Sequence, residues 1–187
     1  MNKTAQTEYY RLFLLEKLPE PLTPASTHVQ IFDNYIENTR MRMRQVRDPY
    51  TNTWNRTLQQ SFSVGESEDA VTKLAEIYLD GAEFEVFSKL DAPAAVRKNR
   101  YFHEFDNVAF FLDVYLGPLS GLVTARVDFP TARLVMEFIP PAFAIFDVTS
   151  DRFFIGKTLS EKTFDEVVQH IEGLTPLTEL RRISAGI

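Results

Sequence analysis

Positively charged residues occupy every second position in two short stretches of the chain. Arg40, Arg42 and Arg44 alternate in TRMRMRQ, and Lys98 and Arg100 alternate in RKNRY. Because alternate side chains of a β-strand lie on one face, each stretch would present a row of cations in one direction. Such a row is either solvated at the surface or gathered around a bound anion, for which guanidinium groups are well shaped. Both interpretations remain open from these residues alone.

Acidic residues accompany these cations on the neighbouring predicted strands. Asp113 shares one strand face with Tyr115, and Asp128 shares one face of the next strand with Arg126. The opposite faces are apolar, so the three strands predicted between 96 and 129 form a meander with one apolar and one charged side. In most hairpins of this kind the charged side is simply solvated.

This meander resembles the CYTH domain, the family of triphosphate tunnel metalloenzymes that includes class IV adenylyl cyclases, thiamine triphosphatases and inorganic tripolyphosphatases. In that family a Lys-x-Arg-Tyr strand precedes a strand with an aspartate and then a Gly-Leu-Val-x-Ala-Glu-x-Glu strand. The chain has KNRY at 98–101, Asp113, and GLVTARVD at 121–128 in those places. Arg126 replaces the first glutamate of the last motif.

Other segments resemble the same family in the same order over nearly the whole chain. RMR at 42–44 stands where the family keeps Arg-x-Arg, and Glu76 stands on a strand that often bears Glu-x-Glu. FDVTSDRFF at 146–154 stands where family members carry Glu-Val-Thr-Gly-Asp followed by a basic residue and aromatics. Arg152 occupies that basic position.

The chain departs from the family where paired acids are expected. The first strand of the family carries Glu-x-Glu-x-Lys, whereas Tyr10 and Leu12 follow Glu8 here. Tyr78 likewise takes the place of the second acid after Glu76. Two carboxylates at positions i and i+2 of a strand can point at one metal ion, and hard divalent cations need several such oxygens. Each of these pairs is broken in this chain.

The resemblance implies an α+β fold, a closed antiparallel β-barrel of about eight strands that encloses a tunnel, with flanking helices. We expect a single CYTH-like domain over 1–187. Its barrel is expected at about 5–160 and its C-terminal helices at about 163–184.

Two helices are predicted from capping boxes, in which Asp80 pairs with Glu83 and Thr163 pairs with Glu166. The apolar stripe predicted for the first helix consists of Ala82, Val86, Phe87 and Leu90. The stripe predicted for the second consists of Phe164, Val167, Val168 and Ile171. We expect the second helix to pack on the outside of the barrel.

Family tunnels hold a triphosphate with cations and hold Mg²⁺ or Mn²⁺ with carboxylates, which implies two sets of residues in the lumen. The phosphate-binding set is Arg42, Arg44, Lys98, Arg100 and Arg152, to which Arg126 adds a further positive charge. The metal-binding set is Glu8, Glu76, Asp113, Asp128 and Asp147. An arginine at ~4 Å from a metal site costs several kcal/mol, so metal binding is expected to suffer more than anion binding. No catalytic residue is assigned.

Two functions follow from this resemblance. In the first, a divergent tunnel protein binds a triphosphate or another phosphorylated polyanion in a basic lumen, and its catalytic metal site is degraded. In the second, the protein is an active metal-dependent phosphohydrolase that acts on tripolyphosphate or on a nucleoside or thiamine triphosphate. Whether the chain is an enzyme therefore stays open.

Composition limits the remaining possibilities. The 187 residues carry a net charge of −6 and include no cysteine, which argues against general nucleic-acid or anionic-membrane binding and removes thiolate chemistry. No apolar run approaches ~18 residues, and the three histidines have no metal-ligand spacing. We expect a soluble cytoplasmic protein, a possible homodimer, whose partner is a phosphorylated small molecule.

Overall fold

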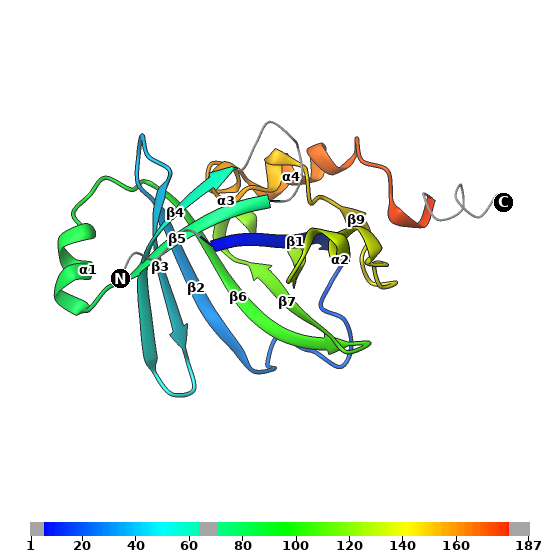
Figure 1. The fold of residues 1–187 in the computed structure, drawn as a ribbon, viewed down its shortest axis with the longest axis horizontal. Coiled ribbons are helices and arrows are strands. Elements are labelled where there is room, and N and C mark those ends of the chain that lie inside the picture. The colour runs from blue at the N-terminus through cyan, green and yellow to red at the C-terminus, as the bar shows by residue number, and fades with distance from the viewer. Residues whose placement is uncertain (1–5, 64–70, 180–187) are drawn as a thin grey trace.

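A computed structural model describes residues 6–63 and 71–179, and these residues form a closed antiparallel barrel with a few short helices (Figure 1). The strands of the described residues are β1 (Gln6–Leu15), β2 (His28–Tyr35), β3 (Met41–Asp48), β4 (Thr53–Ser63), β5 (Val71–Tyr78), β6 (Ala94–Phe105), β7 (Val108–Tyr115), β8 (Val123–Phe129) and β9 (Phe146–Asp147). Their order is β5-β4-β3-β2-β6-β7-β8-β1-β9, and an additional β5–β1 pairing closes the first eight into the barrel. The predicted fold class is confirmed.

The helical segments are short and lie outside the strands. Within the described residues they are α1 (Gly81–Phe87), η1 (Gly117–Leu119), α2 (Ala132–Glu137), η2 (Arg152–Phe154), α3 (Gly156–Leu159) and α4 (Phe164–Ile171). Residues 177–179 are also helical, and the part of the predicted C-terminal helices beyond 179 lies outside the described residues. None of the described helices has the length and apolar composition that crossing a membrane would require.

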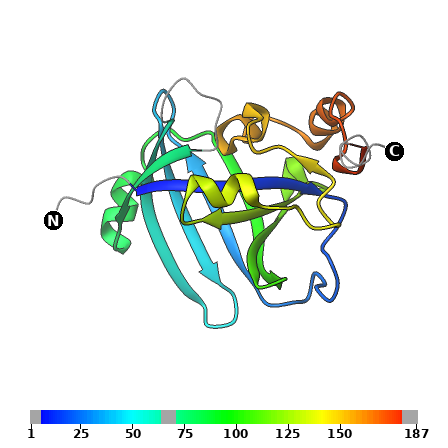
Figure 2. The same cartoon turned by 45° about the vertical axis from the view of Figure 1, so that its right-hand side comes forward.

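The main apolar core lies between the outer wall of the barrel and the segment that follows β8. Phe13, Leu112 and Ala125 point outward from three neighbouring strands and are completely buried. They belong to one cluster with Ala144 and with the half-buried Phe138. Figure 2 shows α2 (yellow) lying across β1 (dark blue), so this wall is covered from the outside. The apolar side of the predicted meander is therefore the outer side.

Strand register turns the charged side of the meander into the lumen. Arg100 lies opposite Asp113, which in turn lies opposite Thr124. On the other half of the barrel Asp33 lies opposite Arg44. Because neighbouring residues in register point to the same side of a sheet, closure of the barrel brings these polar side chains face to face.

The C-terminal segment covers one end of the barrel. Leu14 and Tyr115, from strand faces that point inward, share an apolar cluster with Phe154 and with Val167 of α4. Figure 1 shows α3 and α4 together at this end. The helix predicted outside the barrel is thus found over its end, because the chain leaves β9 beside Leu14, close to where β1 finishes.

The first helix differs from its prediction. Asp80 and Glu83 form the predicted capping box, but α1 contains no buried residue and Val86 is 63% exposed. Phe87, as predicted, packs against the cluster around Met43, and Phe84 packs there beside it. A helix of seven residues makes only about two turns, so few of its side chains can contact the strands. The predicted buried stripe was wrong at Ala82, Val86 and Leu90, which are all exposed.

Candidate functional site

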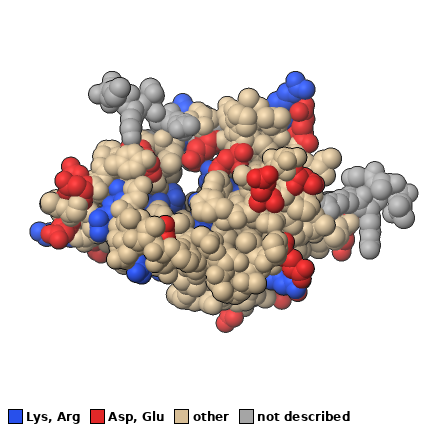
Figure 3. Space-filling model, turned by 90° about the horizontal axis from the view of Figure 1, so that it is seen from below, with Lys and Arg blue, Asp and Glu red and all other residues tan. Residues whose placement is uncertain are grey.

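The lumen contains a cavity of about 530 Å³ with a strongly basic lining. Seven cationic residues and three carboxylates line it, which is an excess of four positive charges. Figure 3 looks into this hollow from below and shows Lys and Arg side chains inside it. Low-dielectric walls with charges of one sign concentrate the electrostatic field and attract small anions.

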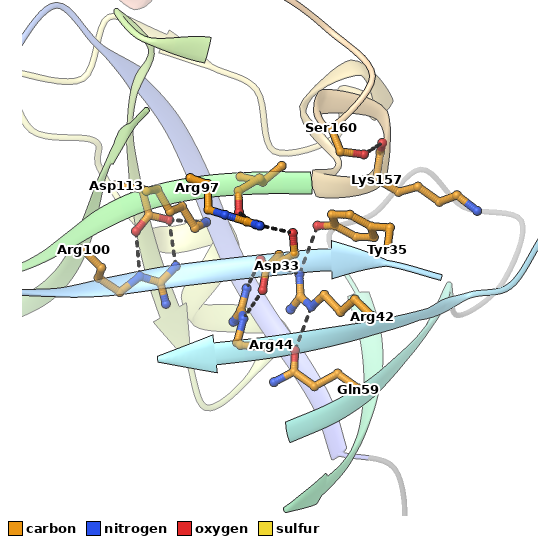
Figure 4. A network of polar contacts seen from close by, with 12 residues as sticks. Asp33, Tyr35, Arg42, Arg44, Gln59, Arg97, Arg100, Asp113, Lys157 and Ser160 are labelled. Atoms are coloured by element: carbon orange, nitrogen blue, oxygen red, sulfur yellow. Dashed lines mark hydrogen bonds and ion pairs between the residues drawn. The ribbon is translucent and has the colours of Figure 1, made fainter. Parts of the chain in front are cut away.

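Asp33 on β2 is the counter-ion of two of these cations. Its carboxylate accepts hydrogen bonds from Nε and Nη2 of Arg44, both 2.6 Å long, and lies 3.5 Å from Nη1 of Arg42 (Figure 4). Asp33 is only 1% exposed. Burial alone would raise the pKa of this carboxyl, but Arg42 and Arg44 outweigh burial and hold the pKa well below its usual range. The group is therefore an anion at any physiological pH.

Asp113 on β7 plays the same part for the cations of β6. It accepts hydrogen bonds from Nε and Nη2 of Arg100, both 2.7 Å long, and its Oδ2 lies 2.6 Å from Nζ of Lys98. Burial disfavours its charge, yet the two cations hold the pKa of Asp113 well below the usual range. Burial lowers the pKa of Lys98 to about 8, despite the opposing effect of Asp113.

These contacts fix the orientation of the lumen cations. Arg42 is held by a 2.8 Å hydrogen bond from its Nε to Oε1 of Gln59 and by a longer one from Nη1 to the Tyr35 hydroxyl. Figure 4 shows Arg42 and Arg44 on β3 and Arg100 on β6, each held by such contacts. Donors that are oriented before a ligand arrives bind it with a smaller loss of conformational entropy.

Arg126 on β8 stands between two carboxylates in a wetter part of the cavity. Its Nε donates a 2.7 Å hydrogen bond to Oδ1 of Asp128, and its Nη2 lies 3.4 Å from Oε2 of Glu8. The guanidinium carbon lies 4.3 Å from the centroid of the Tyr10 ring, a cation–π contact. The side chain of Arg126 is 26% exposed, more than those of Lys98 or Arg100.

The covered end of the barrel also contributes to the lining. Ile155 and Gly156 face the cavity, and Lys157 of α3 adds a cation there. Nζ of Lys157 donates a 2.9 Å hydrogen bond to the Thr39 carbonyl, in the turn between β2 and β3. A Cβ at Gly156 would lie 2.1 Å from the Tyr35 hydroxyl oxygen, so the backbone of α3 approaches this strand closely.

Five of the six residues proposed to bind phosphate line the cavity, namely Arg42, Arg44, Lys98, Arg100 and Arg126. Arg152 is exposed on η2 and is not part of the lining, so its predicted convergence on the lumen was wrong. Arg152 begins the 3-10 turn η2, and the last residue of that turn, Phe154, lines the cavity. Arg40 and Lys157 are the two other lining cations.

The carboxylates proposed to bind metal are spread over different places. Glu8, Asp113 and Asp128 line the cavity, whereas Glu76 is not part of the lining and accepts a hydrogen bond from Gln59. Asp147 pairs with Arg11, whose guanidinium also contacts backbone carbonyls beside α2 on the outer side of the barrel. The predicted convergence of Asp147 on the lumen was therefore wrong.

The arrangement as it stands does not fit a hard divalent cation. In the part of the chain that the structure describes, no three His, Cys, Asp or Glu residues are grouped so that they could hold a metal ion. Asp113 already accepts from Arg100 and Lys98, and Arg126 stands between Glu8 and Asp128. Mg²⁺ and Mn²⁺ require several oxygen ligands that are not already neutralised by protein cations.

Two contributors to the site were missed in the sequence, Asp33 and Lys157. Asp33 stands two positions before Tyr35 in HVQIFDNY, so the alternation of that strand places both on one face. Only the pairing of β2 with β3 shows that this face lies opposite the arginines. Lys157 has no periodic neighbour that could have indicated its direction.

Fold and site together define a closed antiparallel β-barrel in which most of the charged residues that line the tunnel are cations. No family model matches the chain. The chain is 28% identical, over 160 residues, to an inorganic triphosphatase of Nitrosomonas europaea. The match covers 82% of this chain and 97% of that protein.

Two crystal structures have a similar fold. One, of an inorganic triphosphatase, matches with a TM-score of 0.55 and 24% identity over 82% of this chain and 93% of that chain. The other, of the same protein described as hypothetical, matches with a TM-score of 0.56 and 23% identity over 83% and 99%. These similarities support the barrel fold assigned above.

Proposed function

We propose that the tunnel binds tripolyphosphate, or a small molecule that carries a linear polyphosphate, through direct contacts with its lumen cations. The observation that carries this proposal is the excess of four positive charges lining a cavity of about 530 Å³. The similarity to a protein named inorganic triphosphatase points to the same class of ligand.

The distribution of the cations favours an extended anion over a single phosphate. Arg126 lies opposite Phe111 in the sheet, and Lys98 lies opposite Tyr115, four residues further along β7. Because a strand rises about 3.3 Å per residue, these two positions are about 13 Å apart along β7, which for a tilted barrel strand is on the order of 10 Å along the tunnel. Lys157 extends the row to the covered end.

A second candidate function is hydrolysis of the same ligand with a divalent metal, which the name of the Nitrosomonas europaea relative favours. When bound, Mg²⁺ or Mn²⁺ would neutralise phosphate oxygens and activate water. Glu8, Asp113 and Asp128 are the carboxylates in the lining that would have to serve it, and each now faces a protein cation.

Calorimetric titration with sodium tripolyphosphate, in EDTA, tests the first function. We expect saturable binding that is at least tenfold tighter than binding of orthophosphate at equal ionic strength. Equal, weak affinities for the two anions would contradict the proposal. Phosphate release from tripolyphosphate with Mg²⁺ or Mn²⁺ tests the second function, and its loss in Asp113→Asn would support it. A folded protein that binds the anion without turnover would exclude the second function for this ligand.

A further inference from the structure

Arg126 links two carboxylates that lie on the inward faces of two neighbouring strands. Asp128 lies opposite Tyr10 in the register of β8 and β1, and Arg126 lies opposite Leu12. Glu8 is the next inward residue of β1 beyond Tyr10. The guanidinium reaches both acids, at 2.7 Å from Asp128 and 3.4 Å from Glu8.

The surroundings of Arg126 hold the guanidinium there. The Tyr10 ring lies under it at 4.3 Å, and the hydrogen bond from Nε to Asp128 fixes its rotation. A divalent cation between Glu8 and Asp128 would have to displace it, because a 2+ ion about 4 Å from a guanidinium is repelled by several kcal/mol. Two carboxylates with an arginine between them carry one net negative charge. The attraction of this charge for a metal ion is too weak to overcome the repulsion by the guanidinium.

Arg126 is also accessible to a ligand in the lumen. Arg126 lines the cavity and is 26% exposed, so solvent or a ligand oxygen can reach it from the lumen. A guanidinium presents several N–H donors in a plane, which match the oxygens of a phosphate group. Arg126 can therefore contact a phosphate while it remains paired with Asp128.

We propose that Arg126 is a built-in replacement for a divalent metal ion, which neutralises Glu8 and Asp128 and presents a fixed positive charge to the polyphosphate. The ligand then binds without metal. This inference rests on the proposed function for the identity of the ligand, but the exclusion of metal from the Glu8–Asp128 pair does not depend on any ligand.

Binding of Mn²⁺ alone tests that exclusion, followed by the electron paramagnetic resonance signal of the free ion. Arg126→Glu would place a third carboxylate between Glu8 and Asp128, and we expect it to bind Mn²⁺ at least tenfold more tightly than the wild type. Arg126→Gln, which removes the charge without adding a ligand, should lie between the two. The double variant Arg126→Glu, Asp128→Asn should lose most of the gain. Saturable Mn²⁺ binding by the wild type that Asp128→Asn weakens tenfold would overturn the inference.

The role of Arg126 toward the ligand is tested separately with tripolyphosphate. In the wild type, Mg²⁺ should weaken tripolyphosphate binding, because it neutralises the anion before the protein does. In Arg126→Glu, Mn²⁺ should strengthen it at least tenfold over EDTA. Strengthening by Mg²⁺ in the wild type would contradict the replacement.

The two proposals fail in different ways. A wild type that binds neither tripolyphosphate nor Mn²⁺ would sink the proposed function, while the Mn²⁺ gain in Arg126→Glu would still decide the metal exclusion. Circular dichroism and thermal unfolding show whether each variant keeps the barrel. If Arg126→Glu fails to fold, Arg126→Gln is compared with the wild type instead. A Mn²⁺ affinity of Arg126→Gln that is equal to that of the wild type would contradict the inference.

Discussion

Asp33 and Arg44 form a bidentate pair across β2 and β3, with two hydrogen bonds of 2.6 Å, in the interior of a tunnel that is otherwise basic. If the lumen binds a polyanion as proposed, a buried carboxylate there has a cost, since it reduces the positive charge available to the ligand. Its benefit is structural, because Arg42 and Arg44 would otherwise repel each other in the lumen without a counter-charge. Stability and ligand affinity therefore make opposing demands on this residue.

Asp33→Asn should destabilise the protein by about 3–5 kcal/mol, because the substitution leaves buried arginines without their partner. Tripolyphosphate should recover part of this loss, and its stabilising effect should be larger in the variant than in the wild type. Urea unfolding with and without the ligand measures both effects. Asp128→Asn is the matched control, since Asp128 is 44% exposed and its pair should be worth at most about 1 kcal/mol. Equal losses of unfolding free energy in the two variants would contradict the role of Asp33 as a buried counter-ion.

Lys98 should make ligand binding depend on pH. Its pKa of about 8 means that the amine loses its charge as the pH rises through that value. A bound polyanion favours the charged form and raises this pKa, so binding takes up a proton between the two values and affinity falls with rising pH there, by up to about tenfold per pH unit. Calorimetry from pH 7 to 9 measures the slope. Lys98→Arg keeps the charge and should remove the part of the pH dependence that Lys98 causes. An unchanged slope in this variant would mean that the pH dependence comes from titration of the ligand itself.

Lys157 and Arg152 test which cations of the covered end reach the ligand. Both are exposed and lie in neighbouring short helices, but only Lys157 lines the cavity. Lys157→Gln should weaken tripolyphosphate binding about two- to fivefold, the usual effect of one solvent-accessible charge. Arg152→Gln should leave the affinity unchanged. The opposite ranking would show that Arg152, as the sequence resemblance implied, approaches the lumen.

Gly156 tests how closely α3 must approach the barrel. Gly156→Ala would bring a methyl group to 2.1 Å from the Tyr35 hydroxyl oxygen, so either α3 or Tyr35 must move. We expect a loss of about 1–3 kcal/mol in the free energy of unfolding, as in other overpacked sites. Gly81→Ala, with open space around its Cβ, should change stability by less than about 1 kcal/mol. Similar values for both variants would mean that α3 yields without strain.

Much of the fold could be predicted because its signals are local. Alternation of side chains is a property of each strand by itself, so the apolar and charged faces of β6, β7 and β8 follow from residue order. The capping boxes before α1 and α4 are likewise contained in four residues each, and both are present in the structure. The closed barrel itself was inferred from a resemblance, since no local pattern specifies that β5 will pair with β1.

Pairing between distant strands decided the site. The alternation in the sequence places Asp33, Arg44, Asp113 and Arg126 each on a definite strand face, but it does not say which faces meet. The pairing of β1 with β8 sets Arg126 against Glu8, which is more than 100 positions away in the chain. A one-residue slip in any of these pairings would turn the affected charges to the outside. Arg152 and Asp147 lie in a loop-rich segment without such alternation, and their positions depend on how that segment packs over the end of the barrel.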